Sequence, residues 1–352
     1  ESKVARSKFR LTRLQYFSAV DVDTAQVPGL TDQVDLNVSV TERNTGRVMV
    51  GAGVSSAEGL MGSFNVSQAN FAGTGNTVAL GISTGSINRT YSLSYTDPYY
   101  TDDGVSRGFT VYRRDRNTAK LRGIGTYNTY SYGGGVNFGI PLSETDFLNF
   151  GVTLDFTELD LTSRSPALYK DYCNKALTEG SCNADALEFN IGIKTDTRDN
   201  VLTPTEGMLT MYNATLTAPV MDLQYYKLNA SSEYYKPLDK NKKFTLKLRG
   251  SLGYAQEYGD EDYPFFKNFF MGGVRSVRGY RTSSIGPKYF NSTANRWFTT
   301  GGTTSVNLSA ELYFPIPGLK DNKAFRLSTF IDAGGVFSDN ESLSSADQYE
   351  KG

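Results

Sequence analysis

The sequence predicts an all-β fold: a transmembrane antiparallel β-barrel with a small α+β unit in front of it. Three observations indicate this class. From residue 47 onward, apolar and polar residues alternate along segments of roughly ten residues, the length that a tilted barrel strand needs to cross a bilayer. The connectors between these segments alternate between short and long. The 352 residues include 23 Tyr and 35 Gly, which suits a barrel with aromatic girdles, although a soluble array of β-sandwiches would have a similar composition.

Residues 1–45 predict the small α+β unit. Their first part has apolar residues at helical spacing with basic residues between them, which indicates an amphipathic helix. Two alternating segments follow, one around residues 20–22 and one over 34–41, and a turn at 27–30 separates them. At about 45 residues the unit is too short to be a secure domain alone. The apolar residues of the predicted helix are Val4, Leu11, Leu14 and Phe17.

The barrel strands begin at Arg47, and counting from there gives thirteen. The clearest alternation covers residues 244–254. Similar patterns cover residues 148–156, 187–194 and 305–314. One face of each segment is therefore expected to contact lipid, and the other to face the lumen. In the first segment the apolar face carries Phe244, Leu246, Leu248, Leu252 and Tyr254, and the polar face carries Thr245, Lys247, Arg249 and Ser251.

The connectors predict how the barrel is oriented. Those after even-numbered strands are short to medium turns, whereas those after odd-numbered strands include the two longest, residues 160–183 and 257–303. A soluble sandwich has no reason to place its long loops on one side, but an outer-membrane barrel has short periplasmic turns and longer external loops. We therefore expect residues 46–352 to form the barrel, with both long loops outside the cell and residues 1–45 in the periplasm.

The strand count and the first residues together suggest a fragment. Bacterial single-chain barrels have an even number of strands, whereas this chain has thirteen. Its first residues also lack the pattern of a secretory signal. We expect an unclosed barrel whose last polar stretch, residues 338–352, lies outside the cell, with at least one strand missing.

The composition excludes several kinds of chemistry. The sequence has no His, so neither a Ser-His or Cys-His nucleophile pair nor a His-ligated metal can form. We therefore expect no enzyme, no metal site and no cofactor. The net charge of −1 gives no reason to propose nucleic acid as a partner. Two cysteines cannot build a zinc site, and outside the cytoplasm Cys173 and Cys182 are expected to form a disulfide, the alternative being two unpaired surface thiols.

The longest connector contains the sequence 272–280, rich in glycine and with two arginines. Such a segment can be an ordinary turn with solvated arginines. However, a long loop without strand pattern has to pack somewhere, and a barrel of this size has a lumen to fill. By strand alternation Glu311 and Asp332 point into that lumen. An arginine of the loop, folded back inside, could hold either carboxylate through two hydrogen bonds.

Several short motifs resemble the BamA family of outer-membrane protein assembly factors. They lie at residues 42–46 between the two units and at 277–280 and 285–288 in the long loop, with further matches at 27–29 and 32–35. The resemblance covers essentially the whole chain. It implies a sixteen-stranded barrel, of which this chain supplies strands one to thirteen, preceded by part of the last POTRA domain. The loop motif is Val277, Arg278, Gly279 and Tyr280, and the resemblance implies that Arg278 pairs with Glu311 and Asp332.

The cysteine pair departs from this resemblance. It lies in the fourth external loop, whereas some relatives carry a pair in the sixth. We assign no function to it.

The resemblance implies a protein that folds and inserts other β-barrels into the bacterial outer membrane. The first strand is short and glycine-punctuated, so its pairing with the last strand should be weak and could open sideways to pair with a substrate strand; the glycines could instead simply ease tight curvature. The implied partners are outer-membrane lipids and lipopolysaccharide, unfolded outer-membrane proteins, and the periplasmic lipoproteins of the BAM complex. The residues of this lateral gate are Arg47, Val48, Met49, Val50, Gly51, Ala52, Gly53 and Val54.

Other functions fit the sequence less well. A two-partner secretion transporter is a related barrel with POTRA domains and a similar loop motif, but it exports one protein through its lumen. The junction at residues 42–46 favours assembly over secretion. An outer-membrane phospholipase or protease would usually need His, and a diffusion porin would not carry the N-terminal unit.

Overall fold

The computed structural model describes residues 16–27, 29, 33–55, 58–121, 123–162, 165–176, 182–259, 262–291, 295–316 and 325–338, together with residues 4, 7, 8 and 11. Most of the predicted N-terminal helix, residues 28 and 30 of the predicted turn, and residues 339–352 lie outside this description. Within the described part, no helix is both long and apolar enough to cross a membrane.

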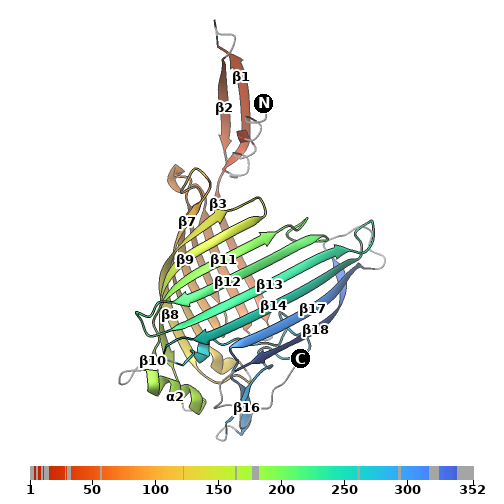
Figure 1. Ribbon diagram of the computed structural model, residues 1–352. Helices are drawn as coiled ribbons and strands as arrows, with labels where there is room; N and C mark the ends of the chain where they lie inside the picture. Colours follow the sequence, from red (N-terminus) through yellow and green to blue (C-terminus); the bar gives the residue numbers. More distant parts are fainter. Residues whose placement is uncertain are drawn as a thin grey trace.

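Thirteen strands form one continuous antiparallel sheet, as the sequence predicted. The sheet curls around a lumen (Figure 1), and each strand pairs with its neighbours in chain order. Within the described residues β3 and β18 are its edge strands, and the two-residue strand β10 (Cys182–Asn183) pairs with β9 outside this order. The strands are β3 (Gly46–Ser55), β4 (Gly59–Gln68), β5 (Thr77–Thr84), β6 (Asn88–Asp97), β7 (Ser106–Asn117), β8 (Asn128–Pro141), β9 (Asp146–Asp160), β11 (Ala186–Asp196), β12 (Gly207–Thr217), β13 (Tyr225–Pro237), β14 (Thr245–Glu257), β17 (Thr304–Pro315) and β18 (Arg326–Phe337).

The two faces of the sheet have the polarity that the alternation predicted. On the outer face, large apolar side chains remain exposed to what would be lipid, among them Leu248, Leu252 and Leu308. On the inner face, Lys247 of β14 forms an ion pair with Glu233 of β13, with 3.3 Å between Nζ and Oε2. An apolar exterior with paired charges inside is the arrangement expected of a barrel in lipid.

A separate two-stranded sheet precedes the barrel. It consists of β1 (Phe17–Gln26) and β2 (Val34–Glu42), and it stands beyond the end of the barrel at which β3 begins (Figure 1). One detail of the prediction is wrong: Phe17 lies in β1, opposite Glu42, and not in the helix. Residues 17–24 satisfy their backbone groups by pairing with β2, which overrides the weak helical spacing of Phe17.

The two long connectors lie together at the other end of the barrel (Figure 1). We call this the loop end and the opposite one the hairpin end. The first connector contains α2 (Ala167–Ala176). The second contains η3 (Phe265–Lys267) and the hairpin of β15 (Lys288–Asn291) and β16 (Arg296–Thr299). The expectation that this loop lacks strands is therefore wrong, because strands of four residues are too short for an alternating pattern to be recognised.

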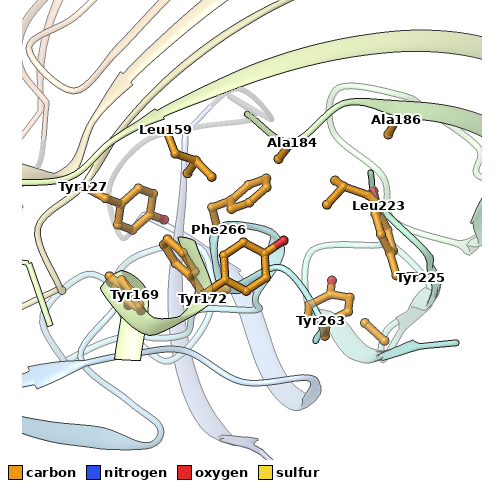
Figure 2. Packing of buried hydrophobic residues seen from close by; sticks show 12 residues of the cluster. Tyr127, Leu159, Tyr169, Tyr172, Ala184, Ala186, Leu223, Tyr225, Tyr263 and Phe266 are labelled. Atoms are coloured by element: carbon orange, nitrogen blue, oxygen red, sulfur yellow. The ribbon is translucent and has the colours of Figure 1, made fainter. Parts of the chain in front are cut away.

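An aromatic core holds the loop end together (Figure 2). Phe265 of η3 stacks on Tyr169 of α2, with 3.9 Å between ring centroids, and both meet Tyr127 edge-on. Aromatic pairs of this kind stabilise a core beyond their buried area. The cluster thus joins both long connectors to the strand ends. Its buried members are Tyr127, Leu159, Tyr169, Tyr172, Ala184, Ala186, Leu223, Tyr225, Ala255, Tyr263, Phe265 and Phe266.

Candidate functional site in the barrel lumen

The motif at residues 277–280 begins with a buried anchor and a turn. Val277 is 2% exposed and packs with Met271, Ile285 and Val336. Gly279 has a φ of +92°, a left-handed conformation that strains residues with a side chain. The anchor and the turn aim the intervening Arg278 at the wall of the barrel.

Arg278 binds two carboxylates on neighbouring strands, β17 and β18. Its Nε and Nη2 donate to Oδ2 and Oδ1 of Asp332, both at 2.7 Å, and its Nη1 donates to Oε1 of Glu311 at 3.1 Å. Its backbone N–H also donates to Asp332. Ser309, which pairs with Asp332 across the strands, donates to the same carboxylate and accepts from Nη2. We call these residues the Arg278 cluster; the structure brings Arg278 together with both acids.

The cluster is largely shielded from solvent. The side chain of Asp332 is 3% exposed, that of Glu311 13% and that of Arg278 23%. The guanidinium carbon lies 3.5 Å above the ring centre of Phe330, which adds a cation–π contact. Hydrogen bonds to Asp332 hold the pKa of Arg278 above its usual range, so the pair stays charged. Tyr280 keeps 39% of its surface exposed, so it packs against the wall only in part.

A second ion-pair cluster anchors the same loop elsewhere on the wall. Lys267 of η3 lies 3.0 Å from Oε1 of Glu188 on β11 and 3.3 Å from Oδ2 of Asp155 on β9. Tyr225 also donates to Glu188, and Lys227 donates to the backbone carbonyl of Lys267. We call this set the Lys267 cluster.

The charge of Lys267 is set by its neighbours. Burial alone lowers the pKa of the Lys267 ammonium, but Tyr225, Glu188 and Asp155 together outweigh burial and hold that pKa above its usual range. Sequence reasoning missed this cluster. Strand alternation did place Asp155 and Glu188 in the lumen, and two facing acids there required a cation, but no motif marked Lys267 as that cation.

The first strand, β3, carries the expected glycines Gly51 and Gly53, but the expectation that it is short is wrong, because it covers ten residues, as many as β4 and β6. It pairs with β4 along its whole length. Gly51 faces Ser63, whose Oγ would lie 2.6 Å from a Cβ at position 51. The outer face carries Val48, Val50 and Val54, all strongly exposed.

Cys173 of α2 and Cys182 of β10 form a disulfide with 5.4 Å between Cα atoms, so this expectation is confirmed. Among the described residues, no group of three or more His, Cys, Asp or Glu could hold a metal ion.

The antiparallel sheet curls into a barrel with an apolar outer face, and buried ion pairs bind a folded-back loop to its inner wall. These features define an outer-membrane β-barrel. Residues 70–352 match the Omp85 superfamily domain. The chain belongs to the Omp85 superfamily, and it is located in the bacterial outer membrane.

Several curated relatives and solved structures are similar to the chain. The outer membrane protein assembly factor BamA of Neisseria meningitidis is 40% identical over 96% of this chain. That of Nitratidesulfovibrio vulgaris is 28% identical over 82%. The chain spans 42% and 34% of these relatives, less than half of either. The crystal structure of BamA from Haemophilus ducreyi lacking POTRA domains 1–3 superposes with a TM-score of 0.87, at 28% identity, and covers 97% of this chain and 67% of that one.

Proposed function

We propose that the protein containing this barrel folds β-barrel proteins and inserts them into the outer membrane. β3 acts as the lateral gate: it opens sideways and offers its backbone N–H and C=O groups to a strand of the incoming protein. No covalent bond is made or broken, so no catalytic residue, metal or cofactor takes part. The observation that carries the proposal is the 40% identity to a BamA over 96% of the chain.

The composition of β3 supports this role. A strand with glycines on its inner face packs few side chains against its neighbour, so separating it costs little packing energy. In lipid, exposed backbone groups need partners, which favours capture of a substrate strand once the edge is free. Arg47, Val48, Met49, Val50, Gly51, Ala52, Gly53 and Val54 are the residues proposed to form this edge.

The wider arrangement completes the proposal. β1 and β2 belong to the last POTRA domain in the periplasm, at residues 1–45, and residues 46–352 form the barrel. The loop end then faces the outside of the cell, and periplasmic lipoproteins bind on the hairpin side. The Arg278 and Lys267 clusters keep the long loop folded into the lumen while the gate opens.

A two-partner secretion transporter is the alternative. CdiB from Acinetobacter baumannii superposes with a TM-score of 0.56 at 15% identity, a likeness that shows the fold alone. The much higher similarity to BamA favours assembly.

Crosslinking in the full-length protein tests the gate. Single cysteines at Val48 and Val50 should form disulfide crosslinks with a cysteine in the edge strand of a substrate arrested during assembly. Cysteines at Ile191 and Ile193, in the middle of the sheet on β11, are the controls because they too are exposed on the outer face. Crosslinks only to β11 would refute the gate at β3.

A further inference from the structure

Two arginines lie on the outer, lipid-facing side of the barrel near the loop end. Arg113 of β7 pairs across the strands with Tyr91, and Arg89 of β6 pairs with Asp115. The same face of these strands continues with Leu93 opposite Val111, both well exposed. Both arginines therefore point outward, at the border of the apolar band that contacts lipid chains.

The charge of these arginines is only partly matched by protein groups. Arg113 donates to Asp115 through Nε alone, at 3.0 Å, and 62% of its side chain is exposed. Within the described residues, neither its two Nη nitrogens nor any side-chain nitrogen of Arg89 has a protein partner. Asp115 thus bonds Arg113 alone, although it also lies opposite Arg89 in the strand register. The next acid on this face, Glu158, is separated from Asp115 by Tyr130.

An arginine at the other end of the same strand and face is enclosed by its own protein, although its Nε has no hydrogen-bond partner there. The guanidinium of Arg107 lies 4.0 Å from the ring centre of Tyr100 and 5.3 Å from that of Phe109, and it reaches Asp97 at 4.0 Å. A barrel arginine facing lipid can therefore be surrounded by its own protein. Arg113 has no such ring contact with any described residue, so its remaining donors are available to another molecule.

Aromatic groups complete the surface around the two arginines. Tyr91, Tyr130 and Tyr132 point outward beside Arg113 and Asp115, and none of their hydroxyls has a protein partner in the described part of the chain. A hollow of about 140 Å³ adjoins Arg89, Asp115 and Tyr130. Guanidinium and phenol groups are hydrogen-bond donors suited to phosphate oxygens, and diagonal neighbours such as Arg89 and Arg113 lie roughly 7–8 Å apart at the backbone, close enough to share one headgroup.

We propose that Arg89 and Arg113, with the surrounding tyrosines, bind a phosphate group of a lipopolysaccharide molecule in the outer leaflet. The position at the border of the lipid-facing band selects a lipid and not a free anion, because acyl chains would lie against Leu93 and Val111 while the headgroup reaches the arginines. The assignment to lipopolysaccharide rests on the proposed orientation, with the loop end outside the cell. It does not require the assembly activity.

Binding of fluorescent lipid A to the full-length protein in phosphatidylcholine nanodiscs tests the site. The double variant R89Q/R113Q should weaken binding of bisphosphorylated lipid A by about tenfold or more, since charge-assisted hydrogen bonds are lost. R107Q, which faces the other leaflet, should bind as the unaltered protein does. Migration on unheated gels checks that each variant is folded.

Three further ligands test which chemical group of the lipid the site recognises. Dephosphorylated lipid A should bind weakly to the unaltered protein and to the double variant alike. Equal binding of lipid A to both proteins, or tight binding of the dephosphorylated form, would overturn the site. Phosphatidylglycerol that binds as tightly as lipid A, or displacement of lipid A by millimolar inorganic phosphate, would overturn the assignment to lipopolysaccharide. No substrate is present in these measurements, so a failure of the proposed assembly function leaves their outcome unchanged.

Discussion

At the level of single residues, Arg278 is the side chain whose removal should matter most. Arg278→Ala would leave Glu311 and Asp332 facing each other without a cation, a change that costs about 3–5 kcal/mol in a fully buried pair and less where water enters the lumen. We expect the loop around residue 278 to become sensitive to protease and assembly to be impaired. Limited proteolysis and complementation by the full-length variant measure the two effects.

Arg275 is the matched control for this substitution. It lies in the same turn and is exposed, and its contact with the wall uses its backbone carbonyl, which accepts from Arg249. Arg275→Ala keeps that carbonyl, so we expect a much smaller effect. Equal sensitivity of both variants would mean that the ion pair does not hold the loop.

Substitution of Lys267 should weaken the second ion-pair cluster, as substitution of Arg278 weakens the first. Lys267→Met leaves Asp155 and Glu188 without their cation and should destabilise the loop end. Adding Glu188→Gln removes one of the two uncompensated charges, so the double variant should recover part of the lost stability. Urea denaturation of the four proteins in a double-mutant cycle measures the coupling. Strictly additive effects would show that Lys267 and Glu188 do not stabilise each other.

The lowered pKa of Asp199 predicts that the stability of its connector, which lies outside the membrane strands, depends on pH. Burial acts to raise the pKa of its carboxyl, but hydrogen bonds from Thr205 and the Glu206 amide, together with Lys242, lower that pKa to about 2. The folded value lies below the ordinary 3.8, so the carboxylate stabilises the connector above that pH, and the contribution is lost as the pH falls through about 2.

Hydrogen exchange measures this dependence. Amides at residues 197–206, corrected for intrinsic rates, should lose protection between pH 4 and 2 as Asp199 becomes protonated. Asp199→Asn should abolish the pH dependence. An unchanged profile in that variant would assign the effect to another group.

Residue-level prediction from the sequence succeeded where alternation fixed the direction of a side chain. Glu311 and Asp332 were placed in the lumen because their strands are long and regular, and a motif named Arg278 as the partner. Lys267 was missed because it lies in an irregular segment, where no period tells which way a side chain points.

At the level of elements, substitutions on the two faces of one strand test which face contacts lipid. Leu248→Arg places a cation on the outer face of β14 and should cost about 2–4 kcal/mol if it lies near the bilayer midplane. Lys247→Ala removes an inner-face partner of Glu233, where lumen water can solvate the acid, so its cost should be smaller. Reversible folding into vesicles under urea gives both values. Equal costs would mean that the two faces are assigned wrongly.

The same elements show what a sequence can predict. All thirteen barrel strands were expected because each is long enough to repeat its alternation several times. The hairpin of β15 and β16 and the helix α2 were not expected. The form of α2 depends on packing in the aromatic cluster of the loop end, and residues distant in sequence, such as Tyr127 and Phe265, supply that packing.

At the level of the whole molecule, one loop is fixed to two separate parts of the wall. The Arg278 cluster joins it to β17 and β18, and the Lys267 cluster joins it to β9 and β11. Between these points the sheet runs through β12, β13 and β14. The loop therefore braces the inside of the barrel across these strands.

The orientation of the whole barrel can be tested with its two cysteines. Both lie at the loop end, so whole cells that produce the full-length protein should show no labelling of Cys173 or Cys182 by an impermeant maleimide before reduction, because the thiols are bonded. After mild reduction both should be labelled in intact cells, since the loop end faces outward. In a variant that lacks both cysteines, a new one at Lys240, in the exposed connector between β13 and β14 at the hairpin end, should react only after the outer membrane is permeabilised. Labelling without reduction would argue against the disulfide. Labelling of Lys240→Cys in intact cells, with Cys173 and Cys182 protected even after reduction, would reverse the orientation and place the lipid A site in the wrong leaflet.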